Sequence, residues 1–206
     1  WTLESLIKKY SDHVAYPIYL EYDQTHYEDE KDAEGNPKKT IEHKNEQINS
    51  CSALWRRNKS ELKEEDYKEF YKNNYNDYED PLFYIHTKAE GTTEYTTLFF
   101  IPSKAPMDMN YADYKPGVKL YVKRVYITDD DKTLLPTYLR FVRGIIDSED
   151  LPLNVSREIL QENKIMSTIR NGSVKKLLSE FKKLSESNPE LFEKFIKEYN
   201  RPLKEG

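Results

Sequence analysis

The chain has 206 residues, of which 37% are hydrophobic and 33% are charged, and its formal net charge is −5 at pH 7. A chain of this length can bury roughly 70% of the surface that its unfolded form exposes, which suits one large domain or one and a half. The acidic balance argues against nucleic acid as the main partner, because binding to phosphates requires a basic surface.

Cysteine content and hydropathy narrow the class of protein. The single cysteine, Cys51, excludes an internal disulfide and a multi-cysteine zinc site, and it fits a reducing compartment. No apolar run approaches the roughly 20 residues of a membrane span, and no signal peptide is visible. We therefore expect a cytoplasmic protein with no membrane partner. The chain starts at Trp1 and stops at Gly206 within a polar stretch, so we expect it to be cut from a longer protein.

The first third of the chain combines a helix with a long hairpin. Apolar residues at helical spacing predict a helix over residues 2–11. Residues 16–22 form a predicted strand, and a second strand is expected near residues 40–44. The acidic stretch between them is interpreted as a solvated hairpin tip. A capping serine followed by clustered acids then predicts a helix that begins near Ser60.

The middle of the chain is rich in strands. Residues 85–89 and 95–101 flank Glu90-Gly91 and form a predicted hairpin. Alternating apolar residues over 118–127 predict one half-buried strand with a bulge at Lys123-Arg124. A last short strand is expected over 141–147.

From Leu151 onward the apolar spacing is helical, with a predicted break at Asn171-Gly172 and a new helix at Asn188-Pro189. These elements predict an α/β (α+β) fold, a three-layer α/β/α sandwich with a mixed sheet, followed by a helical segment. We divide the chain into the sandwich, residues 1–147, and a loop and helical segment, residues 148–206.

The sequence carries no complete active site of its own. Its six glycines are too far apart for a GxxxxGK[ST] or GxGxxG phosphate loop. The four histidines show no HExxH spacing and no metal site is expected; each is interpreted as a surface or partly buried side chain. Cys51 is interpreted as a structural thiol.

The most unusual stretch is Leu-Pro-Leu-Asn-Val-Ser-Arg-Glu-Ile-Leu-Gln, residues 151–161. Asn154 or Ser156 can cap a helix, which would place Arg157 and Gln161 one turn apart on the same face. A guanidinium at a helix N-terminus is a good ligand for a phosphate. The alternative is an ion pair between Arg157 and Glu158, Glu162 or Asp150, and spacing alone favours that alternative.

Several sequence blocks resemble one known family. Leu-Pro-Leu-Asn-Val-Ser-Arg-Glu at 151–158, Lys-Leu-Tyr-Val-Lys-Arg-Val at 119–125 and Tyr-Leu-Arg-Phe-Val-Arg-Gly-Ile-Ile-Asp-Ser-Glu-Asp at 138–150 closely resemble the middle domain of the ninety-kilodalton heat-shock chaperones, and most closely the bacterial form. Shorter blocks agree in order, among them Ala-Leu-Trp at 53–55 and Ala-Pro at 105–106. The resemblance covers essentially the whole chain.

The resemblance implies a role in an ATP-dependent chaperone. A full-length homodimer would hold ATP and Mg²⁺ in an N-terminal domain and would dimerise through a C-terminal domain, and neither domain belongs to this chain. Arg157, with Gln161 as a helper and Asn154 nearby, would reach the γ-phosphate of that ATP from the middle domain. The fragment alone would neither bind nor hydrolyse ATP. The other expected partners are unfolded or partly folded clients and any co-chaperones.

Client binding is expected at Trp55, Met107 and Met109. The family often has a large aromatic residue after Ala105-Pro106, where this sequence has Met107, and methionines on a loop offer an adaptable apolar contact. A core position for Trp55 is the equally favoured alternative.

Two other function classes remain open. The chain could be a non-enzymatic protein-binding module that uses its acidic surface. Nucleic-acid binding through basic residues of the C-terminal helices is the weaker alternative, because basic residues interleaved with apolar ones usually form a solvated helix face. Those residues are Lys164, Arg170, Lys175, Lys176, Lys182 and Lys183.

Overall fold

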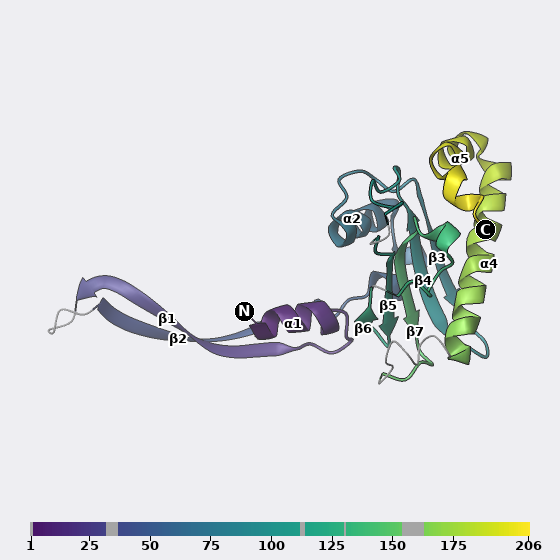
Figure 1. Ribbon diagram of the computed structural model, residues 1–206. Coiled ribbons are helices and arrows are strands. Elements are labelled where there is room, and N and C mark those ends of the chain that lie inside the picture. Colours follow the sequence, from purple (N-terminus) through teal and green to yellow (C-terminus); the bar gives the residue numbers. More distant parts are fainter. Residues whose placement is uncertain (1, 32–36, 112–113, 130, 154–162) are drawn as a thin grey trace. The chain divides into compact units, whose positions relative to one another are not determined.

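The computed structural model describes residues 2–31, 37–111, 114–129, 131–153 and 163–206, with side chains except at 28–31 and 37–38. The chain divides into two compact units, Trp1–Ser52 and Ala53–Gly206, and each has its own internal contacts. Figure 1 labels the helices and strands of both units.

The first unit contains a helix and a two-stranded ribbon. Helix α1, Thr2–Ser11, confirms the helix predicted over residues 2–11. Strands β1, Tyr19–Lys31, and β2, Pro37–Gln47, pair antiparallel, so they extend well into the stretch that we expected to form a solvated tip. Cross-strand polar pairs support this extension: His26 Nε2 lies 3.1 Å from Glu42 Oε2, and His43 pairs with Asp23.

The second unit is built on a five-stranded mixed sheet with strand order β3-β4-β7-β5-β6. Strands β5 and β7 pair parallel, and the other neighbours pair antiparallel. The bounds are β3, Phe83–Ala89; β4, Tyr95–Ile101; β5, Gly117–Val122; β6, Val125–Thr128; and β7, Arg143–Ser148. The β3–β4 hairpin and β7 confirm predicted strands.

The single strand predicted over 118–127 is wrong. The chain reverses at Lys123 and Arg124, whose φ angles are +51° and +67°, so β6 folds back antiparallel on β5. Two consecutive positive φ angles are typical of a type I′ hairpin turn, which usually carries Asn-Gly. Lys-Arg does not signal such a turn, because a β-carbon disfavours positive φ. The apolar pattern also resumes at Val125, directly after the turn.

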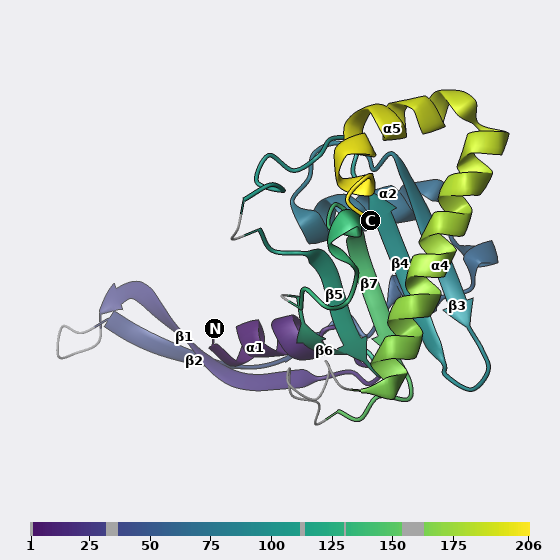
Figure 2. The same ribbon diagram turned by 45° about the vertical axis from the view of Figure 1, so that its right-hand side comes forward.

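Helices cover both faces of the sheet. Helix α2, Glu64–Tyr75, follows two short 3₁₀ turns, η1 at Leu54–Arg56 and η2 at Lys59–Glu61, and lies on one face. Helices α4, Lys164–Ser187, and α5, Pro189–Leu203, lie on the other (Figures 1 and 2). The predicted three-layer α/β/α sandwich with a following helical segment is therefore confirmed.

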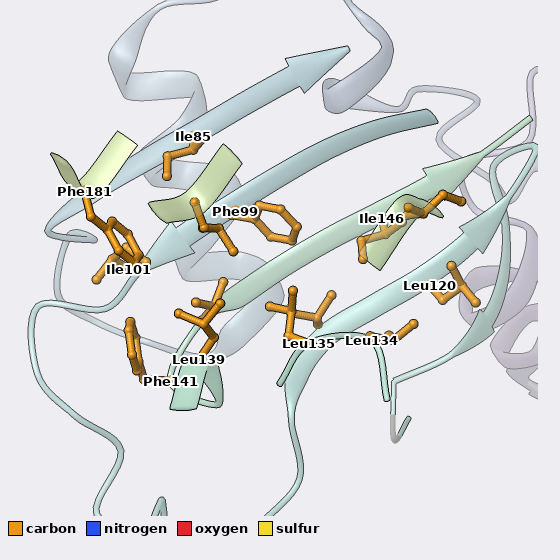
Figure 3. Close-up of a cluster of buried hydrophobic side chains, with 14 of the residues drawn as sticks. Ile85, Phe99, Ile101, Leu120, Leu134, Leu135, Leu139, Phe141, Ile146 and Phe181 are labelled. Carbon is orange, nitrogen blue, oxygen red and sulfur yellow. The ribbon is translucent and has the colours of Figure 1, made fainter. Parts of the chain in front are cut away.

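Each face of the sheet has its own apolar core. The larger core packs α4 and α5 against the sheet and the 3₁₀ turn η3, Thr137–Leu139 (Figure 3). Phe195 and Tyr199 of α5 are fully buried there. The smaller core contains Tyr67 and Tyr71 of α2. Because the helices after residue 148 complete the larger core, the expected boundary at 147/148 does not coincide with the division between compact units, which falls after Ser52.

The predicted helix break at Asn171-Gly172 is also wrong, since α4 runs through both residues. Gly172 has a packing reason instead: a β-carbon at this position would lie 2.2 Å from the Tyr95 hydroxyl oxygen. Glycine is less favourable than alanine in a helix, but at this position its missing β-carbon leaves room for the Tyr95 hydroxyl.

Candidate functional site

The residues predicted to meet a phosphate, Asn154, Arg157 and Gln161, lie outside the described residues. The structure describes the chain on both sides of them, where strand β7 leads in and helix α4 leads out. The candidate site is therefore built from these two anchors and from the side chains beneath them.

Ser148 forms the first anchor. It is fully buried at the end of β7, and its hydroxyl oxygen accepts the backbone N–H groups of Asp150 and Leu151, each at 3.2 Å. Leu151 is buried as well, whereas Leu153 is 54% exposed. The Leu-Pro-Leu lead-in thus leaves the core between residues 151 and 153, and a buried serine fixes the point of departure.

Asn163 forms the second anchor. Its side-chain oxygen accepts the N–H groups of Ile165, at 2.8 Å, and Met166, at 3.4 Å, which makes it the N-cap of α4. Met166 is buried beneath this first turn. The segment that carries Arg157 therefore starts and ends at fixed points of one compact unit.

A buried carboxylate, Asp147, lies next to the first anchor. Its Oδ2 atom accepts the indole N–H of Trp55 at 2.7 Å and lies 3.2 Å from Nε of Arg56. Its Oδ1 atom accepts the backbone N–H of Arg124 at 3.2 Å. The Arg56 guanidinium also pairs with Glu149, so one arginine holds carboxylates on both sides of Ser148. A buried charge of this kind needs all its partners, because losing one leaves it uncompensated.

The loop between β3 and β4 adds a third support. The carboxylate of Asp150 accepts the N–H of Glu94 at 2.6 Å, and the N–H of Glu149 donates to the carbonyl of Glu94 at 3.0 Å. Asp150, one of the acids considered as an ion-pair partner of Arg157, therefore already accepts a hydrogen bond from the backbone. The other two acids, Glu158 and Glu162, lie outside the described residues.

The predicted client patch needs correction at two of its three residues. Trp55 is 1% exposed, with its ring 5.0 Å from that of Tyr121, so the core alternative is correct for this residue. Met109 is 5% exposed. The indole ring of Trp55 packs between α2 and the sheet, and Asp147 accepts its N–H, so this tryptophan is a core residue. Met107 is 96% exposed and is the one member of the three available for contact.

Sequence reasoning missed the support network. Asp147 and Ser148 belong to the family block at 138–150, but no local pattern assigns a structural role to them or to Arg56. One signal existed: Asp147 follows Ile145-Ile146 in a strand buried on both faces, and an acid at such a position requires internal partners.

Two of the basic residues considered for nucleic-acid binding are engaged within α4. Lys176 and Lys183 both pair with Glu180, at 2.8 and 2.9 Å. No helix in the described ranges is long and apolar enough to cross a membrane. The same residues contain no group of three or more histidine, cysteine or acidic side chains placed to hold a metal ion.

Comparison with known proteins decides the family. The sequence profile described as "Hsp90 protein" matches residues 21–206. The chain belongs to the Hsp90 family. The Hsp90 relatives include the "Chaperone protein HtpG" of Treponema denticola, 64% identical over 206 residues, and that of Helicobacter pylori, 60% identical over 206 residues. All of this chain is covered in both comparisons, against 31% and 32% of the two relatives.

A solved Hsp90 structure agrees with the fold. The middle domain of a Plasmodium falciparum heat shock protein is 33% identical, with a TM-score of 0.65, over 75% of this chain and 59% of that one. The predicted resemblance to the middle domain of this chaperone family is thereby confirmed. The chain spans about a third of the length of its curated Hsp90 relatives.

Proposed function

We propose that the chain is the middle segment of an ATP-dependent chaperone and that it supplies Arg157 to the γ-phosphate of ATP bound elsewhere in the longer protein. The observation that carries the proposal is the anchoring of both ends of the Arg157 segment, by Ser148 and Asn163, in a chain of the Hsp90 family. Fixed ends limit how far a short segment can travel, so the guanidinium would reach only a partner that docks at this edge.

Arg157 would stabilise negative charge on the γ-phosphate of ATP. Its planar guanidinium offers several N–H donors to phosphate oxygens and would meet the negative charge that develops during phosphoryl transfer. Gln161 and Asn154 would orient that side chain or add donors. The sequence contains no glycine-rich phosphate loop, so ATP and Mg²⁺ would be held by a part of the longer protein outside this chain. Hydrolysis would then depend on docking between domains.

The support network suits such a role. The buried Asp147 and the half-buried Arg56 and Glu149 form a charged network next to the first anchor. Such a network would hold the start of the catalytic segment in place. The isolated chain would have no ATPase activity, because the nucleotide and the attacking water would lack a binding site.

Client binding is the second part of the proposal. Met107 is nearly fully exposed, and Tyr111, four residues on, is 70% exposed, so these two side chains offer an apolar contact for unfolded polypeptide. The full-length protein would be a cytoplasmic homodimer, assisted by any co-chaperones that recognise it, and would couple ATP hydrolysis to the folding of clients.

The test is Arg157→Ala in the full-length protein. We expect ATP turnover to fall by about two orders of magnitude or more, the usual effect of removing a transition-state arginine, while nucleotide affinity changes little. The matched control is Arg57→Ala, since Arg57 is an exposed arginine of the same compact unit. Unchanged turnover in Arg157→Ala would remove the catalytic role.

The competing function is a protein-binding module without enzymatic connection. Mixing the chain with the separately produced ATP-binding part discriminates the two. Stimulated hydrolysis that disappears with Arg157→Ala supports the catalytic role. Client binding at Met107 together with no stimulation, even at high concentration, favours the module.

A further inference from the structure

A cavity of about 520 Å³ opens on the second unit, outside the Arg157 segment and its supports. It lies between the segment that precedes β5, the segment around η3 and the last turn of α5. This volume falls within the range of small-molecule pockets, roughly 300–1,000 Å³. Its floor is apolar and made of buried side chains of Met109, Tyr114, Val118, Leu134, Leu135, Leu139 and Val142.

Arg140 fixes the rim of the cavity. Its Nε atom donates to the carbonyl of Met109 at 3.2 Å, and Nη1 donates to the carbonyl of Thr137 at 3.0 Å. The two terminal nitrogens grip the carboxylate of Glu205 at 2.6 and 3.0 Å, and Nη2 also reaches Oδ1 of Asn110 at 3.3 Å. One guanidinium thus joins three separate segments, so the cavity is built before any ligand arrives.

The charge at the rim is positive. Lys132, Arg140 and Arg201 line the cavity with one carboxylate, Glu205, and that carboxylate is already bound by Arg140. Hydrogen bonds from Arg140 hold the pKa of Glu205 below its ordinary value, so it stays ionised and neutralises that arginine. Within the described part of the chain, the guanidinium of Arg201 makes no hydrogen bond and no close ion pair, although its charge adds to the lowering of the Glu205 pKa. An anion in the cavity would therefore pair with Arg201, which lines it together with the apolar side chains.

The end of α5 limits how much negative charge the rim accepts. The helix ends at Leu203, beside the cavity, and the carbonyl end of a helix carries a partial negative charge. A dianion such as a phosphate monoester would oppose that dipole twice as strongly as a carboxylate. Of the two guanidinium groups that line the cavity, Arg140 is already paired with Glu205, so a ligand with one carboxylate matches the remaining one, Arg201.

We propose that this cavity binds an amphipathic monocarboxylate, with an aliphatic chain against the apolar floor and the carboxylate at Arg201. Burial of the ligand's aliphatic chain contributes most of the binding free energy, and the charge of Arg201 orients the ligand. This proposal does not depend on the nucleotide or on Met107. The cavity shares Tyr111 with the proposed client contact, so ligand binding is measured without client and its outcome is separate from the proposed function.

The probe is sodium decanoate, compared with decan-1-ol and decylamine below their aggregation concentrations. Methyl ¹H–¹³C spectra report on Val118, Leu139 and Val142, and calorimetry gives the affinity. We expect decanoate to shift these methyl signals and to bind about tenfold more tightly than the alcohol, with the amine weakest. Thr137→Trp, a substitution at an exposed lining residue, should block both decanoate and the alcohol.

Two matched variants of α5 test the contribution of charge to ligand binding. Arg201→Glu should weaken decanoate by about tenfold or more and leave the alcohol unchanged. Lys197→Glu makes a similar charge change one turn earlier on an exposed residue outside the cavity and should leave both ligands unchanged. Equal binding of decanoate and the alcohol, equal weakening by both variants, or methyl shifts elsewhere would each overturn the proposal. Thermal melting confirms that every variant is folded.

Discussion

The indole N–H of Trp55 and the carboxylate of Asp147 are 92 residues apart in the chain and 2.7 Å apart in the fold, and both side chains are buried. Asp147 is the residue before the Ser148 anchor. A tryptophan that sequence alone allowed on the surface therefore fixes the strand end from which the Arg157 segment departs.

Trp55→Phe tests this contact. The ring would still fill most of the space, but Oδ2 of Asp147 would lose its shortest hydrogen bond. Because leaving a buried charged acceptor short of a donor is costly, we expect the free energy of unfolding to drop by roughly 1–3 kcal/mol or more. Urea denaturation measures the change. The double variant with Asp147→Asn should lose less than the sum of the two single variants; strict additivity would show that the contact carries no energy.

Ser148→Ala tests the first anchor. The N–H groups of Asp150 and Leu151 would lose their acceptor, so we expect faster amide hydrogen exchange at residues 150 and 151 and a stability loss of roughly 1–3 kcal/mol. In the full-length protein, ATP turnover should fall while nucleotide affinity changes little. Ser179→Ala, at an exposed position of α4 away from both anchors, is the control and should alter neither measurement. Unchanged exchange at residues 150 and 151 would mean that Ser148 is not an anchor.

Gly172→Ala tests the packing explanation for this glycine. In an exposed helix the change would stabilise by about 1 kcal/mol, because alanine is the better helix former. Here the added β-carbon would meet the Tyr95 hydroxyl oxygen at 2.2 Å, so we expect a loss of roughly 1–3 kcal/mol, measured by thermal or urea unfolding.

The control for Gly172→Ala removes the obstacle. Tyr95→Phe deletes the hydroxyl, and the next ring atom, Cζ, lies at 3.4 Å, an ordinary contact. In that background Gly172→Ala should be neutral or stabilising. A penalty of the same size in both backgrounds would refute the clash with the hydroxyl.

His86 gives the second unit a pH dependence. Its Nε2 atom lies 2.8 Å from the carbonyl of Trp55 and its Nδ1 atom 2.8 Å from the hydroxyl of Tyr67, an arrangement that suits the neutral ring with its proton on Nε2. Burial lowers the pKa of His86 below the ordinary value of 6.5. Below about pH 6.5 the unfolded chain therefore binds a proton that the folded chain does not, and stability falls with acidification.

The expected slope is at most about 1.4 kcal/mol per pH unit, from about pH 6.5 down to the folded-state pKa, with no contribution from this residue above that window. Urea unfolding at about pH 7.5, 6.5 and 5.5 measures it. His86→Gln should be less stable than the wild type at neutral pH but should lose less on acidification. His26→Gln, an exposed histidine on the ribbon, should keep the wild-type slope. Identical slopes in all three proteins would exclude His86 as the group responsible.

The sequence by itself determined the family and most of the local structure. Helical spacing located α1, and Asn188-Pro189 marked the start of α5 with its N-cap hydrogen bond. The acids after Ser60 indicated α2, but the predicted serine cap is wrong, because the helix begins at Glu64 and Ser60 lies in η2. These signals are local, because hydrophobic periodicity and helix capping act over a few residues. The family blocks likewise identified the chaperone middle domain without any structure.

Only the tertiary structure decided features that depend on distant neighbours. The reversal at Lys123-Arg124 was not predicted because the apolar alternation resumes at Val125 after a shift of one residue, which a bulge would also produce. Gly172 predicted a helix break, but α4 continues through it and the glycine makes room for the Tyr95 hydroxyl. Trp55 is buried in the core because Asp147, from a distant strand, accepts its indole N–H. In each case a residue far along the chain fixes the conformation or burial, and a local pattern carries no information about such a partner.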